Sequence, residues 1–261
     1  MRTNKLRELW AAKRQATNCW LSLPSAYSAE IMAHQGWDSV TIDMQHGPLD
    51  FETASAMLVA VSTTDSVPIV RVGWNDPAAI MRVLDAGAYG VMCPTIETAE
   101  ECRRFVGAAR YAPLGYRSVG PGRATLYAGR DYLEQANATV LTLAQIETKL
   151  GLDNCAAIAQ TPGLDMLFVG PSDLGLSLGR VAKPDQTDPV VVSAIETILH
   201  SAHEAGIYAG IFCASVEYGL DMMRKGFDLV TVASDAALLG TGLALRKKFD
   251  QSEIDAPAAR L

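Results

Sequence analysis

The sequence predicts a single-domain α/β protein, a (β/α)8 TIM barrel that spans residues 1–261. Apolar, β-branched runs alternate with amphipathic helical patterns along the whole chain. This alternation implies a parallel sheet, because parallel strands need helical crossovers. About eight such units fill the chain, whose length is typical of a barrel of this kind. A doubly wound open sheet is the alternative, but eight regular units leave no residues over for a second domain.

Each element follows from its own local pattern. Leu6, Leu9 and Trp10 share one face of a short amphipathic helix near the N-terminus. The helix expected over 77–86 has a proline in its first turn and Gly87 after its end, as helix termini prefer. The expected strands are 17–23, 39–42, 68–72, 90–93, 139–146, 164–169, 207–213 and 227–233. The expected helices are 25–35, 51–62, 77–86, 99–109, 131–137, 152–160, 189–205, 216–225 and 238–249, followed by a frayed Ala/Pro tail.

Residues 111–130 break this alternation. They hold four glycines and two prolines, with arginines at 110, 117, 123 and 130. Loops of this length are usually functional or disordered, so a long Gly/Arg-rich loop or lid is expected here. The glycines do not form a P-loop, because no Gly-Lys-Ser/Thr ending and no strand–helix context accompany them.

The composition excludes several function classes. A net charge of −7 argues against general nucleic-acid binding, which relies on excess Lys and Arg. No run reaches the roughly 18 apolar residues of a membrane span, and the basic N-terminus lacks the apolar segment of a secretory signal. The five cysteines form no C-x-x-C pair. They are expected to be reduced core residues of a cytoplasmic protein.

Polar and aromatic residues gather where the expected strands end, the place where barrels of this kind carry their active sites. Glu147 ends a buried strand, where a carboxylate is costly unless an Arg, a backbone donor or a metal ion pairs with it. Asp173 follows the next strand. Two carboxylates without Cys or His at zinc spacing suit a hard divalent cation. The residues expected at this mouth are Trp20, Asp43, His46, Arg71, Gln145, Glu147, Ser172, Asp173 and Phe212.

Simpler interpretations remain open for single residues. Glu147 could pair with a helix N-terminus, and Asp173 could cap the turn that follows its strand. Lys149 could form a Schiff base, but such lysines are usually held in an apolar pocket and this one is expected in a turn. His200 and His203 lie one helical turn apart, but their polar neighbours indicate a solvated face.

Five groups of residues carry a resemblance to a known family. The motifs DMQHG at 43–47, VRV at 70–72 with WNDP at 74–77, QIET at 145–148 and GPSDL at 170–174 occur in this order. The motifs RY at 110–111 and GYR at 115–117 extend the pattern into the loop. Together, over nearly the whole chain, they resemble the HpcH/HpaI aldolase family, above all its 4-hydroxy-2-oxoheptanedioate (2-keto-3-deoxy acid) aldolases.

The resemblance implies a metal-dependent class II aldolase. Such an enzyme cleaves 4-hydroxy-2-oxo acids reversibly to an aldehyde and pyruvate, or hydroxypyruvate, through a metal-stabilised enolate. By position, Glu147 and Asp173 are the implied ligands of Mg²⁺, Mn²⁺ or Co²⁺. His46 is the implied acid/base residue, paired with Asp85, and Arg71 the implied contact of the keto oxygen and developing enolate. The resemblance also implies a cytoplasmic homo-oligomer, a hexamer built as a trimer of dimers.

The resemblance further implies how substrates bind. Backbone N–H groups at 170–173 are expected to receive the carboxylate of pyruvate. Ser172 and Phe212 stand where relatives often have Ala and Leu, which leaves the donor and acceptor preference open. The arginines at 117, 123 and 130 are expected either to bind the distal end of the substrate across a subunit boundary or to form surface salt bridges. The implied substrate-binding residues are Gln145, Gly170, Pro171, Ser172, Trp20, Phe212 and Arg123.

Two other functions fit the same residues. An oxaloacetate-type decarboxylase could use the same metal enolate. A non-catalytic subunit could bind pyruvate without turnover.

Overall fold

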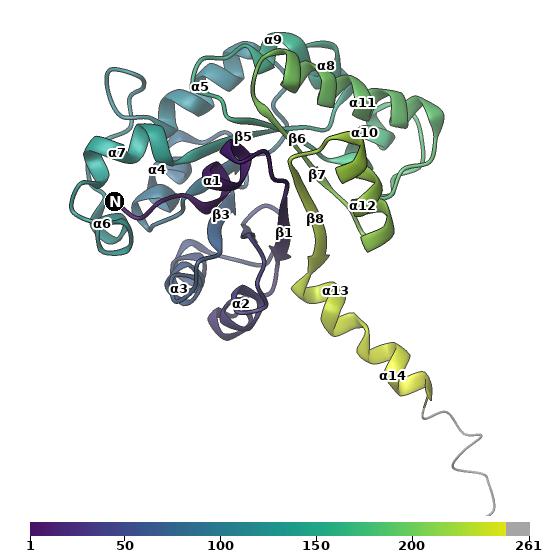
Figure 1. Cartoon of the computed structure of the whole chain (residues 1–261), viewed down its shortest axis with the longest axis horizontal. Coiled ribbons are helices and arrows are strands. Elements are labelled where there is room, and N and C mark those ends of the chain that lie inside the picture. Colours follow the sequence, from purple (N-terminus) through teal and green to yellow (C-terminus); the bar gives the residue numbers. More distant parts are fainter. Residues whose placement is uncertain (249–261) are drawn as a thin grey trace, which may run out of the picture.

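The computed structural model describes residues 1–248 and shows parallel strands closed into an eight-stranded barrel (Figure 1). Each strand pairs with the next along the chain, and the last pairs with the first. The predicted TIM barrel is confirmed, and the open sheet is excluded. The strands are β1 (Ala16–Leu21), β2 (Ser39–Asp43), β3 (Val67–Arg71), β4 (Gly90–Cys93), β5 (Leu141–Ile146), β6 (Met166–Val169), β7 (Tyr208–Phe212) and β8 (Leu229–Ser234).

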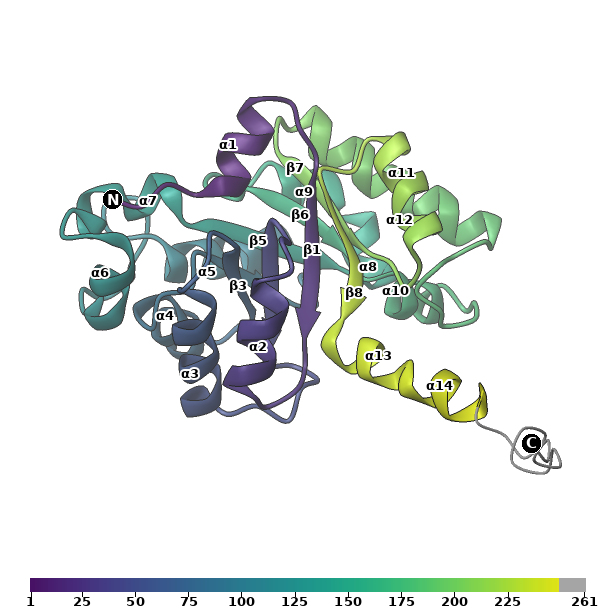
Figure 2. The ribbon, with the colours of Figure 1, turned by 60° about the horizontal axis from the view of Figure 1, so that its bottom comes forward.

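Helices surround this barrel and connect its strands (Figure 2). None of the helices in the described part of the chain is long and apolar enough to cross a membrane. The helices are α1 (Lys5–Ala11), α2 (Ala26–Ala33), α3 (Phe51–Val61), α4 (Pro77–Asp85), α5 (Ala99–Ala109), α6 (Gly122–Ala128), α7 (Tyr132–Thr139), α8 (Lys149–Asp153), α9 (Cys155–Ala159), α10 (Pro171–Ser177), α11 (Pro189–Glu204), α12 (Val216–Lys225), α13 (Asp235–Gly240) and α14 (Gly242–Lys248).

Local capping explains where several helices begin and end. Asp50, Thr98 and Ser215 each accept a hydrogen bond from a backbone N–H in the first turn of α3, α5 and α12. Thr98 and Glu101 together form a capping box. Gly226 ends α12 with a φ of 111°, a conformation that glycine adopts without steric cost. These helix boundaries are therefore encoded in the nearby sequence.

A layer of buried polar side chains crosses the barrel interior. The Asn18 amide donates to the Thr231 hydroxyl at 2.9 Å. Its carbonyl oxygen accepts from the hydroxyls of Ser39 at 2.9 Å and Thr41 at 3.1 Å. Because these buried groups satisfy one another, the layer avoids the cost of unpaired polar atoms. The barrel is thus filled beneath its mouth.

The segment 111–130, expected as a long loop or lid, contains a helix, α6, that was not predicted. Arg123 in this helix donates to the carbonyls of Ala86 at 2.7 Å and Leu58 at 3.1 Å. Ala124 is fully buried. Short helices draw their stability from such tertiary contacts rather than from helix propensity. The local sequence, rich in glycine and proline, therefore gave no sign of α6.

Two other expected helices are interrupted. The helix expected over 152–160 is divided into α8 and α9 at Asn154, whose side chain donates to the carbonyl of Glu97 at 2.8 Å. The helix expected over 238–249 starts earlier, with α13, and continues after Thr241 as α14. Phe249 and the expected Ala/Pro tail lie outside the described residues.

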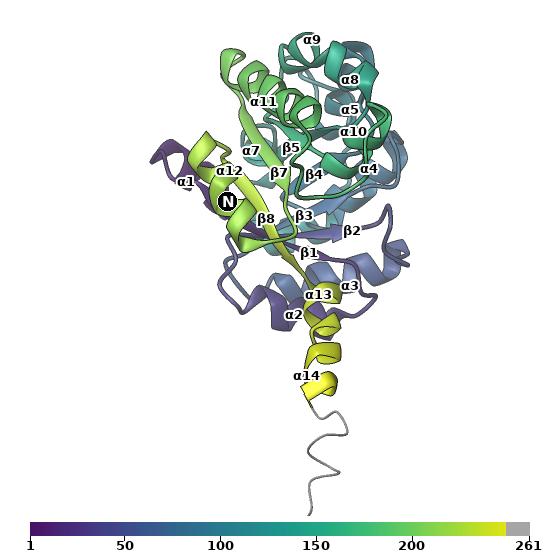
Figure 3. The same ribbon diagram turned by 90° about the vertical axis from the view of Figure 1, so that its right-hand side faces the viewer.

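The helices α13 and α14, which we call the C-terminal arm (residues 235–248), leave the barrel instead of covering it. Figures 1 and 3 show them, in yellow, extending away from the end of β8. Leu239 and Leu243 on this arm are 71% and 63% exposed. Leu238 is also exposed, and a contiguous exposed apolar patch is typical of a surface that another protein covers.

Candidate active site

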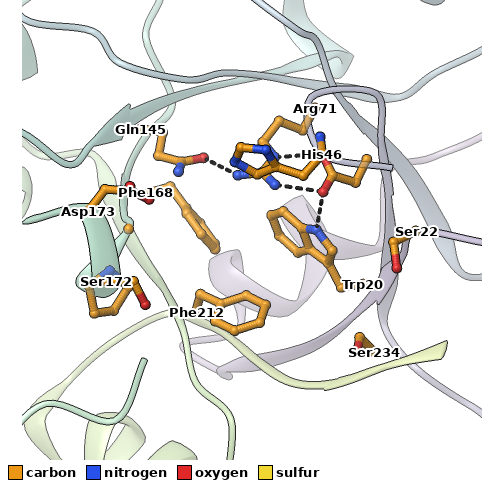
Figure 4. A pocket seen from close by; sticks show the side chains of 13 residues that line it. Trp20, Ser22, His46, Arg71, Gln145, Phe168, Ser172, Asp173, Phe212 and Ser234 are labelled. Carbon is orange, nitrogen blue, oxygen red and sulfur yellow. Dashed lines mark hydrogen bonds and ion pairs between the residues drawn. The ribbon is translucent and has the colours of Figure 1, made fainter. Parts of the chain in front are cut away.

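A pocket of about 360 Å³ opens at the carboxyl ends of the strands (Figure 4). Its walls come from the ends of every strand except β4, or from residues just after them, because strand ends converge at one end of a barrel. The structure therefore brings most of the expected site residues together. The lining residues are Trp20, Ser22, Asp43, His46, Arg71, Gln145, Phe168, Gly170, Pro171, Ser172, Asp173, Phe212 and Ser234.

Arg71 is held in this pocket by Asp43. Its Nε and Nη2 donate to the two carboxylate oxygens at 2.9 and 2.6 Å, a strong bidentate pairing. The Trp20 indole N–H donates to the same carboxylate at 3.0 Å, and the guanidinium carbon lies 4.7 Å from the indole centroid. The Nη1 of Arg71 points to Gln145 Oε1, 3.4 Å away. A positive charge is thus fixed in the pocket.

The pairing also controls the charge of Asp43. Burial alone would raise the pKa of this carboxyl, but the hydrogen bonds and charge of Arg71, with the Trp20 N–H, lower it below its ordinary value. The position of Asp43 at the mouth follows from the sequence, but its role does not. The role of Asp43 follows from the register of β2 against β3, which pairs Asp43 directly with Arg71. Opposite charges therefore meet at adjacent strand ends.

Glu147 is fixed by donors on both of its oxygens. The backbone N–H and the hydroxyl of Thr95 each donate to Oε1 at 2.9 Å. The Gln145 amide donates to Oε2. Burial raises the pKa of Glu147 above its ordinary value, although the bonds from Thr95 and Gln145 oppose this, and the charge of Asp173 raises it further. The carboxylate is therefore oriented before any ligand arrives.

Thr95 and Gly170 make this placement possible. Thr95 has a φ of 51°, in the left-handed region that β-branched residues rarely adopt. A Cβ atom at Gly170 would lie 2.6 Å from Glu147 Oε2, so no larger residue fits there without displacing the carboxylate. Gly170 could be expected here from its motif, but Thr95 could not, because a left-handed threonine has no sequence signature.

Asp173 and Glu147 line a second hollow of about 290 Å³ next to the first. Asp173 lies in the first turn of α10 and is exposed. Among residues 1–248 its carboxylate has no hydrogen-bond or ion-pair partner. It is therefore free to bind a ligand.

These two carboxylates fit a hard divalent cation. Nowhere in the described residues do three His, Cys, Asp or Glu side chains gather in a metal-binding group. Magnesium-type ions instead use one or two carboxylates and complete their shell with water and substrate oxygens. The fixed carboxylate of Glu147 and the free one of Asp173 provide that donor set, beside a hollow that has room for the remaining ligands.

His46 lines both hollows. Its backbone N–H donates to Asp43 Oδ1 at 3.3 Å, which fixes the turn after β2. Its side chain is exposed, and within the described chain the imidazole has no hydrogen-bond partner. The ring is thus available to contact a ligand in either hollow and to exchange a proton with it.

Asp85 does not lie at this mouth. It ends α4, which runs back from the carboxyl ends of the strands, and its Oδ1 accepts a 2.6 Å bond from Arg117. Asp85 lines a separate hollow of about 280 Å³ together with Gly120 and Arg123. A single chain therefore does not form the expected pair between His46 and Asp85.

The three loop arginines also lie away from the mouth. The Arg117 side chain is fully buried and donates to the Tyr132 hydroxyl at 3.0 Å, besides Asp85. Arg123 is bonded to helix-terminal carbonyls, as described above, and Arg130 is exposed. None of them borders the mouth pocket of its own chain.

The structure disfavours the remaining alternatives. Lys149 is 62% exposed and pairs with Asp153 at 2.5 Å, so no apolar pocket surrounds its amine. His200 pairs with Glu204 at 3.0 Å on an exposed helix face. His203 turns instead to Asp228, also at 3.0 Å, so the two imidazoles have separate partners.

Most of the chain resembles known proteins in sequence and structure. Residues 16–240 match the family described as HpcH/HpaI aldolase/citrate lyase. A hydroxypyruvate/pyruvate aldolase from Rhizorhabdus wittichii is 44% identical over 236 residues, which cover 90% of this chain and 94% of that protein. A 4-hydroxy-2-oxo-heptane-1,7-dioate aldolase from Salmonella dublin is 36% identical over 250 residues, 94% of each chain. The crystal structure of an HpcH/HpaI aldolase/citrate lyase family protein from Burkholderia cenocepacia has a TM-score of 0.86 at 35% identity, and the match covers 94% of this chain and 99% of that one.

Proposed function

Because this chain belongs to the HpcH/HpaI aldolase/citrate lyase family and is a pyruvate/hydroxypyruvate aldolase, we propose that its barrel mouth works with a divalent metal ion. The reaction is the reversible cleavage of a 4-hydroxy-2-oxo acid to an aldehyde and pyruvate, or hydroxypyruvate. The observation that supports the proposal is the carboxylate pair of Glu147 and Asp173 beside the fixed guanidinium of Arg71.

In this proposal Glu147 and Asp173 hold Mg²⁺, Mn²⁺ or Co²⁺. When bound, such an ion supplies Lewis-acid polarisation of the substrate keto group. Gln145 lies between Arg71 and Glu147 and is placed to donate or accept at the substrate oxygens. Pro171 and Ser172 border the same pocket on the side of Asp173 and are proposed to contact the 2-oxo acid.

Arg71 and His46 carry the charge and the proton. When the carbon–carbon bond breaks, negative charge develops on the keto oxygen as the enolate forms. Arg71 stabilises it without reorganising, because Asp43 already holds the guanidinium in place. His46, free at the border of the pocket, accepts the proton of the substrate 4-hydroxyl during cleavage and returns it during synthesis.

Removal of divalent ions tests this function. Dialysis against EDTA is expected to lower pyruvate formation from a 4-hydroxy-2-oxo acid by more than about 100-fold, because the Lewis acid is lost. Added Mg²⁺, Mn²⁺ or Co²⁺ should restore the rate. Full activity after EDTA treatment, together with a covalent pyruvate adduct trapped by borohydride, would contradict the proposal and indicate a Schiff base.

We further propose that neighbouring copies complete the mouth, in a hexamer arranged as a trimer of dimers. Asp85 and Arg123 lie near the amino ends of the strands, so they can meet His46 only across a subunit boundary. The C-terminal arm, with its exposed leucines, supports contact with another copy. In this arrangement Asp85 of the partner subunit orients His46, and Arg123 of the partner subunit approaches the distal end of the substrate.

Complementation between subunits tests this arrangement. His46→Ala and Asp85→Asn are each expected to lower turnover strongly. When the two variants are co-expressed, mixed assemblies should regain activity that neither parent shows, because some sites combine an intact His46 with an intact Asp85. His46→Ala mixed with Arg71→Lys is the matched control. Both residues line the pocket of one chain, so every site in this mixture carries one of the two substitutions and no rescue is expected. Absence of rescue in the first mixture would contradict a shared site.

A further inference from the structure

Two serines line the end of the mouth pocket that lies away from Asp173. Ser22 follows β1 and Ser234 ends β8, and Figure 4 shows both beyond the Trp20 ring. Trp20 and Phe212 stand edge to face, 5.4 Å apart, between these serines and Asp173. The pocket therefore has an ionic end and, past an aromatic wall, a hydroxyl-lined end.

A buried carboxylate stands behind the serines. Asp235 is 2% exposed and accepts the Ser22 N–H at 3.0 Å, the Ser22 hydroxyl at 3.2 Å and the Leu23 N–H at 3.1 Å. The Ala236 N–H adds a bond of 2.7 Å. Each of these donors is uncharged, so hydrogen bonds rather than a counter-charge hold the carboxylate. Negative charge therefore lies next to this end of the pocket.

The same bonds orient the two serine hydroxyls. The Ser22 hydroxyl gives its proton to Asp235, so its lone pairs remain for a ligand. The Ser234 oxygen accepts the Ala237 N–H at 3.1 Å, so its proton remains for a ligand. One acceptor and one donor match an alcohol, which both donates and accepts. A carboxylate only accepts, and here it would also approach the charge of Asp235.

We propose that Ser22 and Ser234 form a subsite for a hydroxyl group of the acceptor aldehyde. The enzyme then favours short, uncharged hydroxyaldehydes over aldehydes that carry a distal carboxylate. This inference rests on the proposed function, which places the 2-oxo acid beside Glu147 and Asp173 and leaves the aromatic end for the aldehyde. In synthesis, C3 of pyruvate loses a proton and bonds to the aldehyde carbon, whose oxygen takes up a proton, while the aldehyde hydroxyl faces the serines.

Matched aldehydes and variants test the subsite. Glycolaldehyde and propanal differ only in a hydroxyl against a methyl group, so their ratio of kcat/KM in synthesis with pyruvate reports recognition of the hydroxyl. The double variant Ser22→Ala/Ser234→Ala is expected to lower this ratio about tenfold relative to the unaltered enzyme, the effect of roughly one hydrogen bond. Asp235→Asn is expected to raise kcat/KM for succinic semialdehyde relative to glycolaldehyde.

Ser25→Ala is the matched control for the serine substitutions. Ser25 caps α2 by accepting the Ser28 N–H at 3.1 Å, as Ser234 caps α13, but it does not line the pocket. Ser25→Ala should leave unchanged both the glycolaldehyde-to-propanal ratio and the succinic semialdehyde-to-glycolaldehyde ratio of kcat/KM. Because each ratio is taken within one variant, a general loss of folded enzyme cancels. Where Asp235→Asn fails to fold, the serine double variant decides the test.

Exchange of the pyruvate methyl protons with deuterium separates the two levels of the proposal, because it requires no aldehyde. In one outcome the double variant still exchanges the pyruvate protons but keeps an unchanged ratio of kcat/KM for glycolaldehyde to that for propanal. This outcome would overturn the hydroxyl subsite and leave the proposed function standing. Loss of exchange in the unaltered, metal-loaded enzyme would overturn both. The expected result is persistent exchange with a lowered ratio.

Discussion

Replacing Glu147 by alanine is expected to abolish aldolase turnover and to weaken Mn²⁺ binding by more than about 100-fold. Changing only an outer partner of a metal ligand typically costs 10- to 100-fold in affinity, so loss of the ligand itself should cost more. The donors from Thr95 and Gln145 would also lose their acceptor. Calorimetric titration with Mn²⁺ beside steady-state kinetics measures both effects. Asp173→Ala should act in the same direction, with less effect on folding because its carboxylate is exposed.

Lys149→Ala is the control for this experiment. Lys149 lies two residues after Glu147 but is exposed and paired with Asp153, so its removal should preserve metal affinity and turnover. Unchanged Mn²⁺ affinity in Glu147→Ala would contradict the ligand assignment. Loss of activity in Lys149→Ala would instead favour covalent catalysis by the amine.

Replacing Arg71 by lysine is expected to lower kcat by about 100- to 1000-fold, as removal of a donor to a developing oxyanion commonly does. Lysine keeps the positive charge but lacks the planar guanidinium. In Arg71, Nε and Nη2 of this group bind both oxygens of Asp43, and Nη1 points toward Gln145 and the substrate side. Affinity for Mn²⁺ should change little, because Arg71 does not contact Glu147. Kinetics of cleavage and deuterium exchange into pyruvate measure the loss at the enolate step.

A second buried arginine separates this effect from a loss of stability. Arg110 pairs with Asp165 at 2.7 Å near the amino ends of the strands, away from the mouth. Arg110→Lys should therefore lower the unfolding temperature while the folded enzyme keeps its kcat. If Arg110→Lys lowered kcat as much as Arg71→Lys, disturbed packing rather than a lost substrate contact would explain both results.

Local patterns predicted most of the fold. Caps such as Thr98 and stops such as Gly226 act within a few residues, so helix boundaries could be found without knowledge of the barrel. The errors fall where distant contacts outweigh local preference. The bonds of Arg123 to the ends of α3 and α4 support α6 in a stretch rich in glycine and proline. The bond of Asn154 to Glu97 accompanies the break between α8 and α9.

The site shows the same division. Trp20, Arg71, Gln145 and Asp173 could be placed at one mouth because the ends of parallel strands converge there. The role of Asp43 needed the register of β2 against β3. The position of Thr95 needed a backbone conformation that sequence does not report.

The sequence alone determined the barrel, its family resemblance and the strand-end side chains, because periodicity and spacing act over short distances along the chain. The tertiary structure alone decided which groups meet. It pairs Asp43 with Arg71, bonds Thr95 to Glu147 and bonds Ser22 to Asp235. It also places Asp85, paired with Arg117, at the opposite end of the barrel from His46. The physical reason is that hydrogen bonds and charge pairs depend on ångström-scale distances between residues far apart in sequence, and only the closed barrel sets those distances.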